Sequence, residues 1–234
     1  MKKAVWIMAV VALALTAAVL PFLPETVPVH FNAAWQPDRW GSRVELLLLP
    51  AILFLLSGVW MVIFRSFEKK AADAEDDKVR AEALANRKAA GIAGISVNAV
   101  LLLLQIYVLL LVYRAAEGGE IPGSALDKLP FFLVGILFIV LGNIMPKTRL
   151  NGVIGFRTNE SMYNENTWRR TNRFGGYALV LAGVLVLIAN ALIPNVLAAL
   201  VAIMVFSTAA IVATLAYSHR VYAEEKERSE KGEN

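Results

Sequence analysis

The stretch VELLLLPAILFLLSGVWMVIF, residues 44–64, decides the fold class of this chain. Its one charged residue is Glu45 at the edge, and Pro50 lies in its first turns. As a helix the stretch would be about 32 Å long, which matches the hydrocarbon core of a bilayer. A buried helix of a soluble protein does not need so long an uncharged run. The stretch therefore predicts a transmembrane helix.

Five further apolar runs accompany it, and none of them contains a charged residue. The 234-residue chain is 58% apolar and 18% charged, with the charges gathered between the runs. We therefore predict an all-α, polytopic membrane bundle of six transmembrane helices. The first run follows Lys2 and Lys3 and also resembles a signal peptide, so a five-helix mature form is the alternative. The further runs are 4–20, 89–113, 129–145, 174–193 and 196–217.

Lysine and arginine are divided unequally between the two sides of this predicted bundle. Of 23 such residues, 19 lie in segments 1–3, 65–88, 146–173 and 218–234, and four lie in the segments that alternate with them. Cytoplasmic loops carry an excess of these residues, so the sequence predicts that both termini are cytoplasmic. The net charge of +4 has the same explanation, and we expect no direct nucleic-acid partner.

Two of the basic segments are predicted from their composition to extend the spans. Residues 65–88 mix basic and acidic side chains with alanine and contain no Gly or Pro. They form a predicted charged cytoplasmic helical linker, made of extensions of the second and third spans. The charged cytoplasmic tail, residues 218–234, is expected to fray.

The residues that enzymes and metal sites need are missing or separated. The chain has no cysteine, no zinc-protease or nucleophile-elbow motif and no phosphate-binding glycine loop. The two histidines, His30 and His219, lie on opposite predicted sides of the membrane. We therefore expect no enzyme, no metal and no cofactor.

A few uncharged polar residues lie inside the spans. Asn98 and Gln105 are seven residues apart on the third span and share a helix face, and Asn143 lies on the fourth. Interhelical hydrogen bonding is the simplest role for such amides. The alternative is a transporter of small or amphipathic molecules, with these three residues along its path.

The predicted outer loop, residues 23–43, reads LPETVPVHFNAAWQPDRWGSR. Its prolines restrict the chain to extended or turn conformations. Two tryptophans, a histidine and an Asp-Arg pair lie among them. The loop is either a cap on the bundle mouth or a recognition surface for an arriving amphipathic peptide. Its candidate recognition residues are His30, Asn32, Asp38, Arg39 and Trp40.

The predicted inner basic loop, residues 146–173, is irregular and rich in turn residues. An Asn-Gly turn signal stands at 151–152 and a further glycine at 155. Arg157 could donate two hydrogen bonds to a carboxylate or phosphate. Residues 161–171 are expected to form a short amphipathic helix on the inner membrane surface. The candidate residues of this loop are Asn151, Gly155, Arg157, Thr158, Trp168 and Arg173.

Both loops resemble those of the SdpI family of membrane proteins. The inner loop carries GNIMPKTRLNGVIGFRT at 142–158, followed by Trp168, Asn172, Arg173 and two glycines at 175–176. The outer loop resembles a DUF1648-type segment in LP at 23–24, PVHFN at 28–32 and PDRWGS at 37–42. The resemblance divides the chain into a DUF1648-like helical hairpin (1–64), the linker (65–88), an SdpI-like four-helix region (89–217) and the tail.

The resemblance implies a function that composition cannot give. Members of the family protect a bacterium from its own secreted killing peptide, and one also sequesters a cytoplasmic transcriptional repressor. The resemblance thus implies an immunity or signalling protein of a bacterial plasma membrane. Its partners would be the lipid bilayer, an extracellular toxin peptide and a cytoplasmic repressor.

Overall fold

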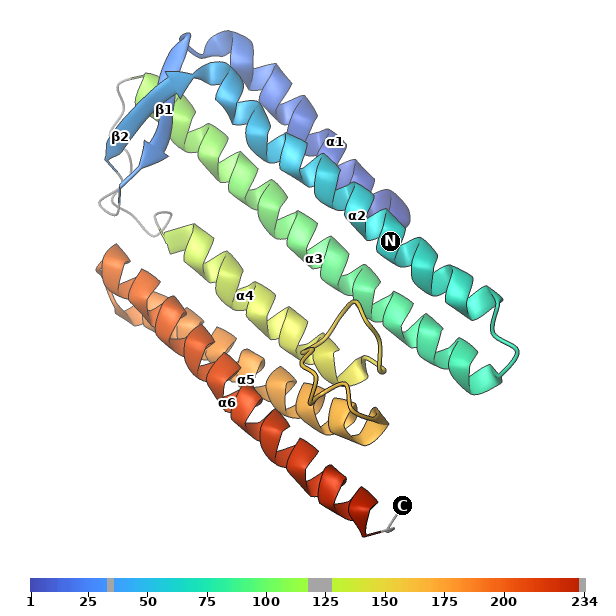
Figure 1. Cartoon of the computed structure of the whole chain (residues 1–234). Helices are drawn as coiled ribbons and strands as arrows, with labels where there is room; N and C mark the ends of the chain where they lie inside the picture. Colours follow the sequence, from blue (N-terminus) through green and yellow to red (C-terminus); the bar gives the residue numbers. More distant parts are fainter. Residues whose placement is uncertain (33–35, 118–127, 232–234) are drawn as a thin grey trace.

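Six long helices and one small antiparallel sheet make up the computed structural model (Figure 1), which describes residues 1–32, 36–117 and 128–231. The six predicted spans are confirmed, because each helix is long and apolar enough to cross a membrane. The elements are α1 (Lys2–Val19), η1 (Leu20–Phe22), β1 (Thr26–Phe31), β2 (Pro37–Ser42), η2 (Arg43–Leu47), α2 (Leu48–Ala72), α3 (Asp77–Ala116), α4 (Leu129–Ile144), η4 (Met145–Lys147), α5 (Glu165–Leu192) and α6 (Val196–Glu230).

The loops divide between the two ends of the bundle. The sheet lies at one end, and the α2–α3 turn, the basic loop and the C-terminus lie at the other (Figure 1). We call these the hairpin end and the basic end. That the basic end faces the cytoplasm stays a prediction from the Lys and Arg count.

The predicted outer loop contains a β-hairpin that we did not expect from its prolines. Strands β1 and β2 pair with register shifts on either side of His30. Pro28 is tolerated because each strand of a two-stranded sheet has an unpaired edge. Val27 is fully buried in a cluster with Leu23, Leu46, Leu109 and Val112, which fixes the hairpin on η2 and on the end of α3.

The helical extensions predicted for the linker are confirmed. Helix α2 continues to Ala72, and α3 begins at Asp77, with the Asp76 carboxylate accepting from the backbone N–H of Lys78 at 2.6 Å. The expectation that the tail frays is wrong for its described part. Helix α6 runs to Glu230, and Glu224 and Glu225 hold it against Arg170 and Asn166 at the start of α5.

Helices α1, α2 and α3 form one unit, which we call the N-terminal half. Four residues of α1 are fully buried on one face: Val5, Ala9, Ala12 and Thr16. Their spacing of three and four residues is that of a single helix stripe. Helix α1 is therefore a packed member of the bundle, as a signal-anchor would be.

Helices α4, α5 and α6 form the C-terminal half, where glycines bring α4 and α5 together. Gly142 faces Gly176 and Gly135 faces Gly183, so closely that a Cβ on Gly142, Gly176 or Gly183 would lie 2.6 Å from the partner's carbonyl oxygen. Such close approach of backbones is typical of membrane helices, because van der Waals contact drives their association.

The two halves meet where α3 passes α4 and where the basic loop lies against α3. The backbone N–H of Arg149 donates to Asn86 Oδ1 at 2.7 Å, and Lys78 forms an ion pair with Glu165 at 3.2 Å. Ile154 of the loop packs on the N-terminal cluster that contains Phe64 and Ala90. The loop therefore contacts both halves, which makes it the central element of the basic end.

Candidate functional site

The basic loop folds around the side chain of Asn151, which was predicted as a site residue. Its Oδ1 accepts from the backbone N–H groups of Val153 and Ile154, both at 2.8 Å, and its Nδ2 donates to the carbonyls of Arg149 and Ile154. One nearly buried amide thus satisfies four backbone groups. Asn151 acts as the internal support of the loop.

Gly155 lies directly above the first turns of α5. Its φ is +115°, a backbone conformation that residues other than glycine rarely adopt. A Cβ there would meet Asn172 Oδ1 at 2.7 Å and the Trp168 ring at 2.8 Å. Asn172, fully buried, also accepts the backbone N–H of Phe156 at 2.7 Å. Glycine is therefore required where the loop touches the helix.

The interpretation of residues 161–171 as a separate surface helix is wrong. Residues 165–171 are the first turns of α5, and Ser161 belongs to a turn that precedes them. Trp168 is 1% exposed, and its Nε1 donates to the carbonyl of Thr148 at 3.2 Å. The tryptophan points into the protein because the loop supplies both an apolar cover and an acceptor for its N–H.

Thr158 belongs to a second turn of the loop. Its backbone N–H donates to Ser161 Oγ at 2.8 Å, and its own hydroxyl accepts the backbone N–H of Ser161 at 3.0 Å. Its hydroxyl also lies 3.4 Å from that of Ser218 on α6. Ser161 is fully buried and was missed, since serine alone gives no signal until its partner is known.

Two predicted arginines of the loop are exposed and available to a partner. Arg157 is exposed, and Arg173 lies over the Tyr177 ring at 5.8 Å, with its Nε donating to the tyrosine hydroxyl at 3.3 Å. The loop therefore combines an inner framework of asparagine, threonine, glycine and tryptophan with an exposed cationic surface.

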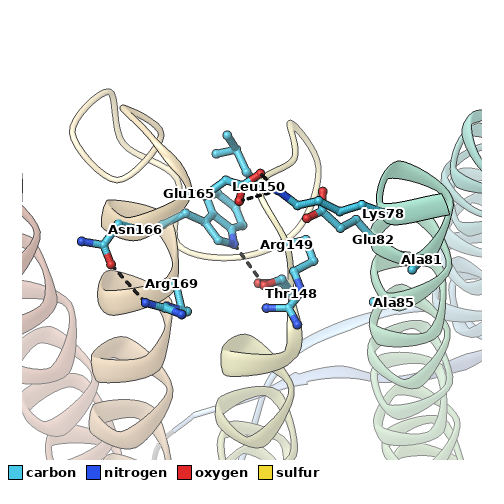
Figure 2. Close-up of a pocket in the computed structure, with 11 residues that line it drawn as sticks. Lys78, Ala81, Glu82, Ala85, Thr148, Arg149, Leu150, Glu165, Asn166 and Arg169 are labelled. Atoms are coloured by element: carbon cyan, nitrogen blue, oxygen red, sulfur yellow. Dashed lines mark hydrogen bonds and ion pairs between the residues drawn. The ribbon is translucent and has the colours of Figure 1, made fainter. Parts of the chain in front are cut away.

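A cleft of about 530 Å³ opens beside this loop, between α3 and the start of α5 (Figure 2). Lys78 reaches across it to both carboxylate oxygens of Glu165, at 3.2 Å each. Arg149 and Arg169 add two more cations to its lining. Sequence reasoning missed this cleft, because its two walls are almost ninety residues apart in the chain.

At the hairpin end, the predicted recognition residues lie on or beside the two strands. His30 Nδ1 lies 2.5 Å from Asp38 Oδ1 across the sheet, and Arg39 pairs with Glu45 of η2. Asn32 Oδ1 accepts the backbone N–H of Gln36 at 3.0 Å. Trp40 is 57% exposed. Trp35, the other tryptophan of this loop, lies outside the described residues.

The three predicted intramembrane amides lie in different surroundings. Asn98 Nδ2 donates to Ser57 Oγ at 2.8 Å and to the carbonyl of Val5, so it joins three helices. Gln105 Nε2 donates to Thr16 Oγ1 at 2.7 Å and to the carbonyl of Leu46. Asn143 is exposed on α4. The geometry supports interhelical hydrogen bonding for Asn98 and Gln105, and the transporter path through all three residues stays a prediction.

A charged cluster near the N-terminus was also missed. Glu68 pairs with Lys2 at 2.5 Å and with the nearly buried Arg87 at 2.9 Å, and the Arg87 guanidinium lies 3.9 Å from the centre of the Phe64 ring. The mixed charges of the linker concealed these pairs. In the three described ranges no group of three or more His, Asp or Glu side chains could hold a metal ion.

The fold and these two ends define a polytopic helical membrane protein with a β-hairpin at one end and a structured basic loop at the other. Residues 7–54 match the model of a domain of unknown function, DUF1648, and residues 147–218 match the SdpI/YfhL protein family. The two matches fall on the segments that carry the outer and the inner loop, so the resemblance predicted from those loops is confirmed.

Two relatives are similar to the chain over different lengths. The Immunity protein SdpI of Bacillus subtilis is 24% identical over 221 residues, which cover 94% of this chain and 96% of that protein. An uncharacterized protein of Archaeoglobus fulgidus is 54% identical over 41 residues, which are 18% of this chain and 22% of that protein. No solved structure matches the chain significantly.

Proposed function

We propose that this protein is a non-enzymatic immunity or signalling protein of a bacterial plasma membrane, which binds a secreted killing peptide. The observation that carries the proposal is the similarity to Immunity protein SdpI along 94% of the chain. The SdpI/YfhL region supports it, because it coincides with the structured basic loop and the two helices that follow.

The hairpin is the proposed recognition surface for that peptide. In the orientation predicted from Lys and Arg, it faces the outside of the cell. It offers an exposed tryptophan, Trp40, beside the His30–Asp38 and Arg39–Glu45 pairs, and Phe22 at its base is 76% exposed. Aromatic side chains flanked by charged groups suit an amphipathic peptide, which has an apolar and a polar face.

The basic loop is the proposed surface for a cytoplasmic partner such as a transcriptional repressor. Arg157 and Arg173 are exposed on a loop whose interior is fixed by Asn151, Asn172 and Trp168. A rigid loop loses little conformational entropy on binding, which favours recognition of a protein.

A killing assay tests the proposal. Deleting the gene from its host should increase sensitivity to the peptides that the host or its neighbours secrete, and the intact gene should restore resistance. Trp40→Ala should restore it only partly, whereas Trp6→Ala, which removes an exposed tryptophan of α1, should restore it fully. A deletion strain with unchanged sensitivity to every such peptide fraction would refute the immunity function.

A further inference from the structure

One face of α3 connects the polar cleft of the basic end to an apolar groove nearer the membrane. Lys78, Glu82 and Ala85 line the cleft, and Ala89 and Ala93 line the groove. Their spacing of three or four residues keeps all five on one side of the helix. Thr148 lines both spaces, so the cleft and the groove are adjoining parts of one slot.

The polar part of the slot contains two arginines that are free to bind an anion. Among the residues that the structure describes, no carboxylate lies within ion-pair distance of Arg149 or Arg169, whereas Lys78 is occupied by Glu165. Arg169 donates to Asn166 Oδ1 at 3.3 Å, and Asn86 fixes the backbone of Arg149. Figure 2 shows Arg169 and Thr148 on the bundle side of the Lys78–Glu165 pair.

The apolar part of the slot is a groove of about 290 Å³ between the two halves. Leu141 of α4, Met145 of η4, Phe156 of the loop and Leu179 of α5 line it opposite α3. Its α3 residues, 89 and 93, are at the end of the predicted third span, and the cleft residues lie beyond that end. The slot thus changes from apolar to cationic where a membrane changes from hydrocarbon to headgroup.

We propose that this slot binds one anionic phospholipid, with its phosphate on Arg149 and Arg169 and an acyl chain in the groove. Guanidinium groups form paired hydrogen bonds with phosphate oxygens, and a basic pocket between membrane helices is a known form of headgroup site. A soluble anion would leave the groove unused. Because α3 belongs to one half and α4 and α5 to the other, the bound lipid joins the two halves.

The full-length protein in mixed micelles provides the test, with phosphatidylglycerol as the probe and phosphatidylcholine as the zwitterionic comparison. Bound lipid is counted by native mass spectrometry. Phosphatidylglycerol should be retained at least tenfold more tightly than phosphatidylcholine. Arg149→Gln and Arg169→Gln should each weaken its retention about fivefold, which corresponds to about 1 kcal/mol for each basic side chain.

Two variants separate a built site from general attraction between charges. The double variant Lys3→Gln/Lys69→Gln removes two exposed cations of α1 and α2 from the same end and should retain the lipid like the wild type. Ala93→Leu fills the groove and should weaken retention of phosphatidylglycerol while the circular-dichroism spectrum stays unchanged.

Three results would overturn the proposal. Equal retention of the two lipids would show that the arginines do not select the headgroup. A loss in the Lys3→Gln/Lys69→Gln variant as large as in Arg149→Gln or Arg169→Gln would show that only net charge matters. Full displacement of the lipid by equimolar glycerol 3-phosphate would identify a soluble phosphate as the ligand.

Discussion

The two halves of the bundle are held together by different means. In the N-terminal half, buried amides and hydroxyls join the helices: Asn98 to Ser57 and Val5, and Gln105 to Thr16 and Leu46. In the C-terminal half, α4 and α5 instead touch through their backbones at Gly142 and Gly176. Lipid is as apolar as leucine, so membrane helices associate by hydrogen bonds or by close packing. The contacts of Asn98 and Gln105 are of the first kind, and the contact between α4 and α5 is of the second.

Because of this difference, the two halves should respond differently to substitutions at their helix contacts. A hydrogen bond that is lost leaves a helix interface close to its original shape. A side chain added between two backbones forces the helices apart and displaces everything that they carry. Since α4 and α5 flank the basic loop, the C-terminal half should be the more sensitive of the two.

The largest expected effect is that of Gly176→Val. The new Cβ would lie 2.6 Å from the Gly142 carbonyl oxygen and 2.8 Å from Pro146 Cδ, so α4 and α5 must separate. We expect a loss of about 3 kcal/mol in the free energy of unfolding, the upper end for overpacking a tight contact. Thermal unfolding in mild detergent measures it, followed by tryptophan fluorescence, to which the buried Trp168 contributes.

Gly58→Val is the matched control for this contact. Gly58 also lies within a transmembrane helix, but a Cβ there meets no atom within 4 Å. Its unfolding temperature should stay within a few degrees of the wild type. A comparable loss in both variants would mean that valine destabilises these helices irrespective of the contact, and the contrast between the halves would fail.

A smaller effect is expected from Asn98→Leu in the N-terminal half. The variant removes both hydrogen bonds of the amide to α1 and α2, and interhelical bonds of this kind contribute about 1 kcal/mol each. Adding Ser57→Ala should cost about 1 kcal/mol more, since the Ser57 hydroxyl also donates to the Val5 carbonyl at 3.0 Å and that hydrogen bond is then lost. Asn143→Leu, at an exposed position of α4, should leave the unfolding temperature unchanged. Equal losses for Asn98→Leu and Asn143→Leu would contradict a packing role.

These contacts also show how far the sequence could predict the structure. The six spans follow from uncharged runs, and the shared face of Asn98 and Gln105 follows from their spacing. The sequence did not indicate that Trp168 is buried, because its acceptor is a carbonyl twenty residues away. The hairpin was missed for a related reason. Val27 fixes it on Leu109 and Val112 of a distant helix, whereas its prolines suggested only extended or turn backbone.

The residues of the candidate site also divide into those that the sequence predicted and those that it did not. Asn151 and Gly155 were predicted because Asn-Gly pairs and glycines are typical of turns, and both residues lie in turns of the loop, Asn151 through its amide and Gly155 through its positive φ. Arg149, Arg169 and Asn86 were not singled out. They matter only because α3 passes beside the loop, and no local pattern reports that two distant segments meet.

The smallest effect on stability, and the most direct test of how the halves are joined, concerns Lys78 and Glu165. Their ion pair crosses from α3 to α5, yet both side chains are more than 60% exposed, so replacing either should leave the unfolding temperature unchanged. Lys78→Glu should instead increase hydrogen–deuterium exchange in the first turns of α5, because it places two negative charges where α3 faces the start of α5. Glu165→Lys in the same chain should reverse the increase, and 1 M salt should abolish it. Arg80→Gln, which breaks a pair within α3 alone, should not affect α5. If Arg80→Gln raised exchange in α5 as much as Lys78→Glu did, the start of α3 would be loosening as a whole. The contact between α3 and α5 would then not depend on the Lys78–Glu165 pair.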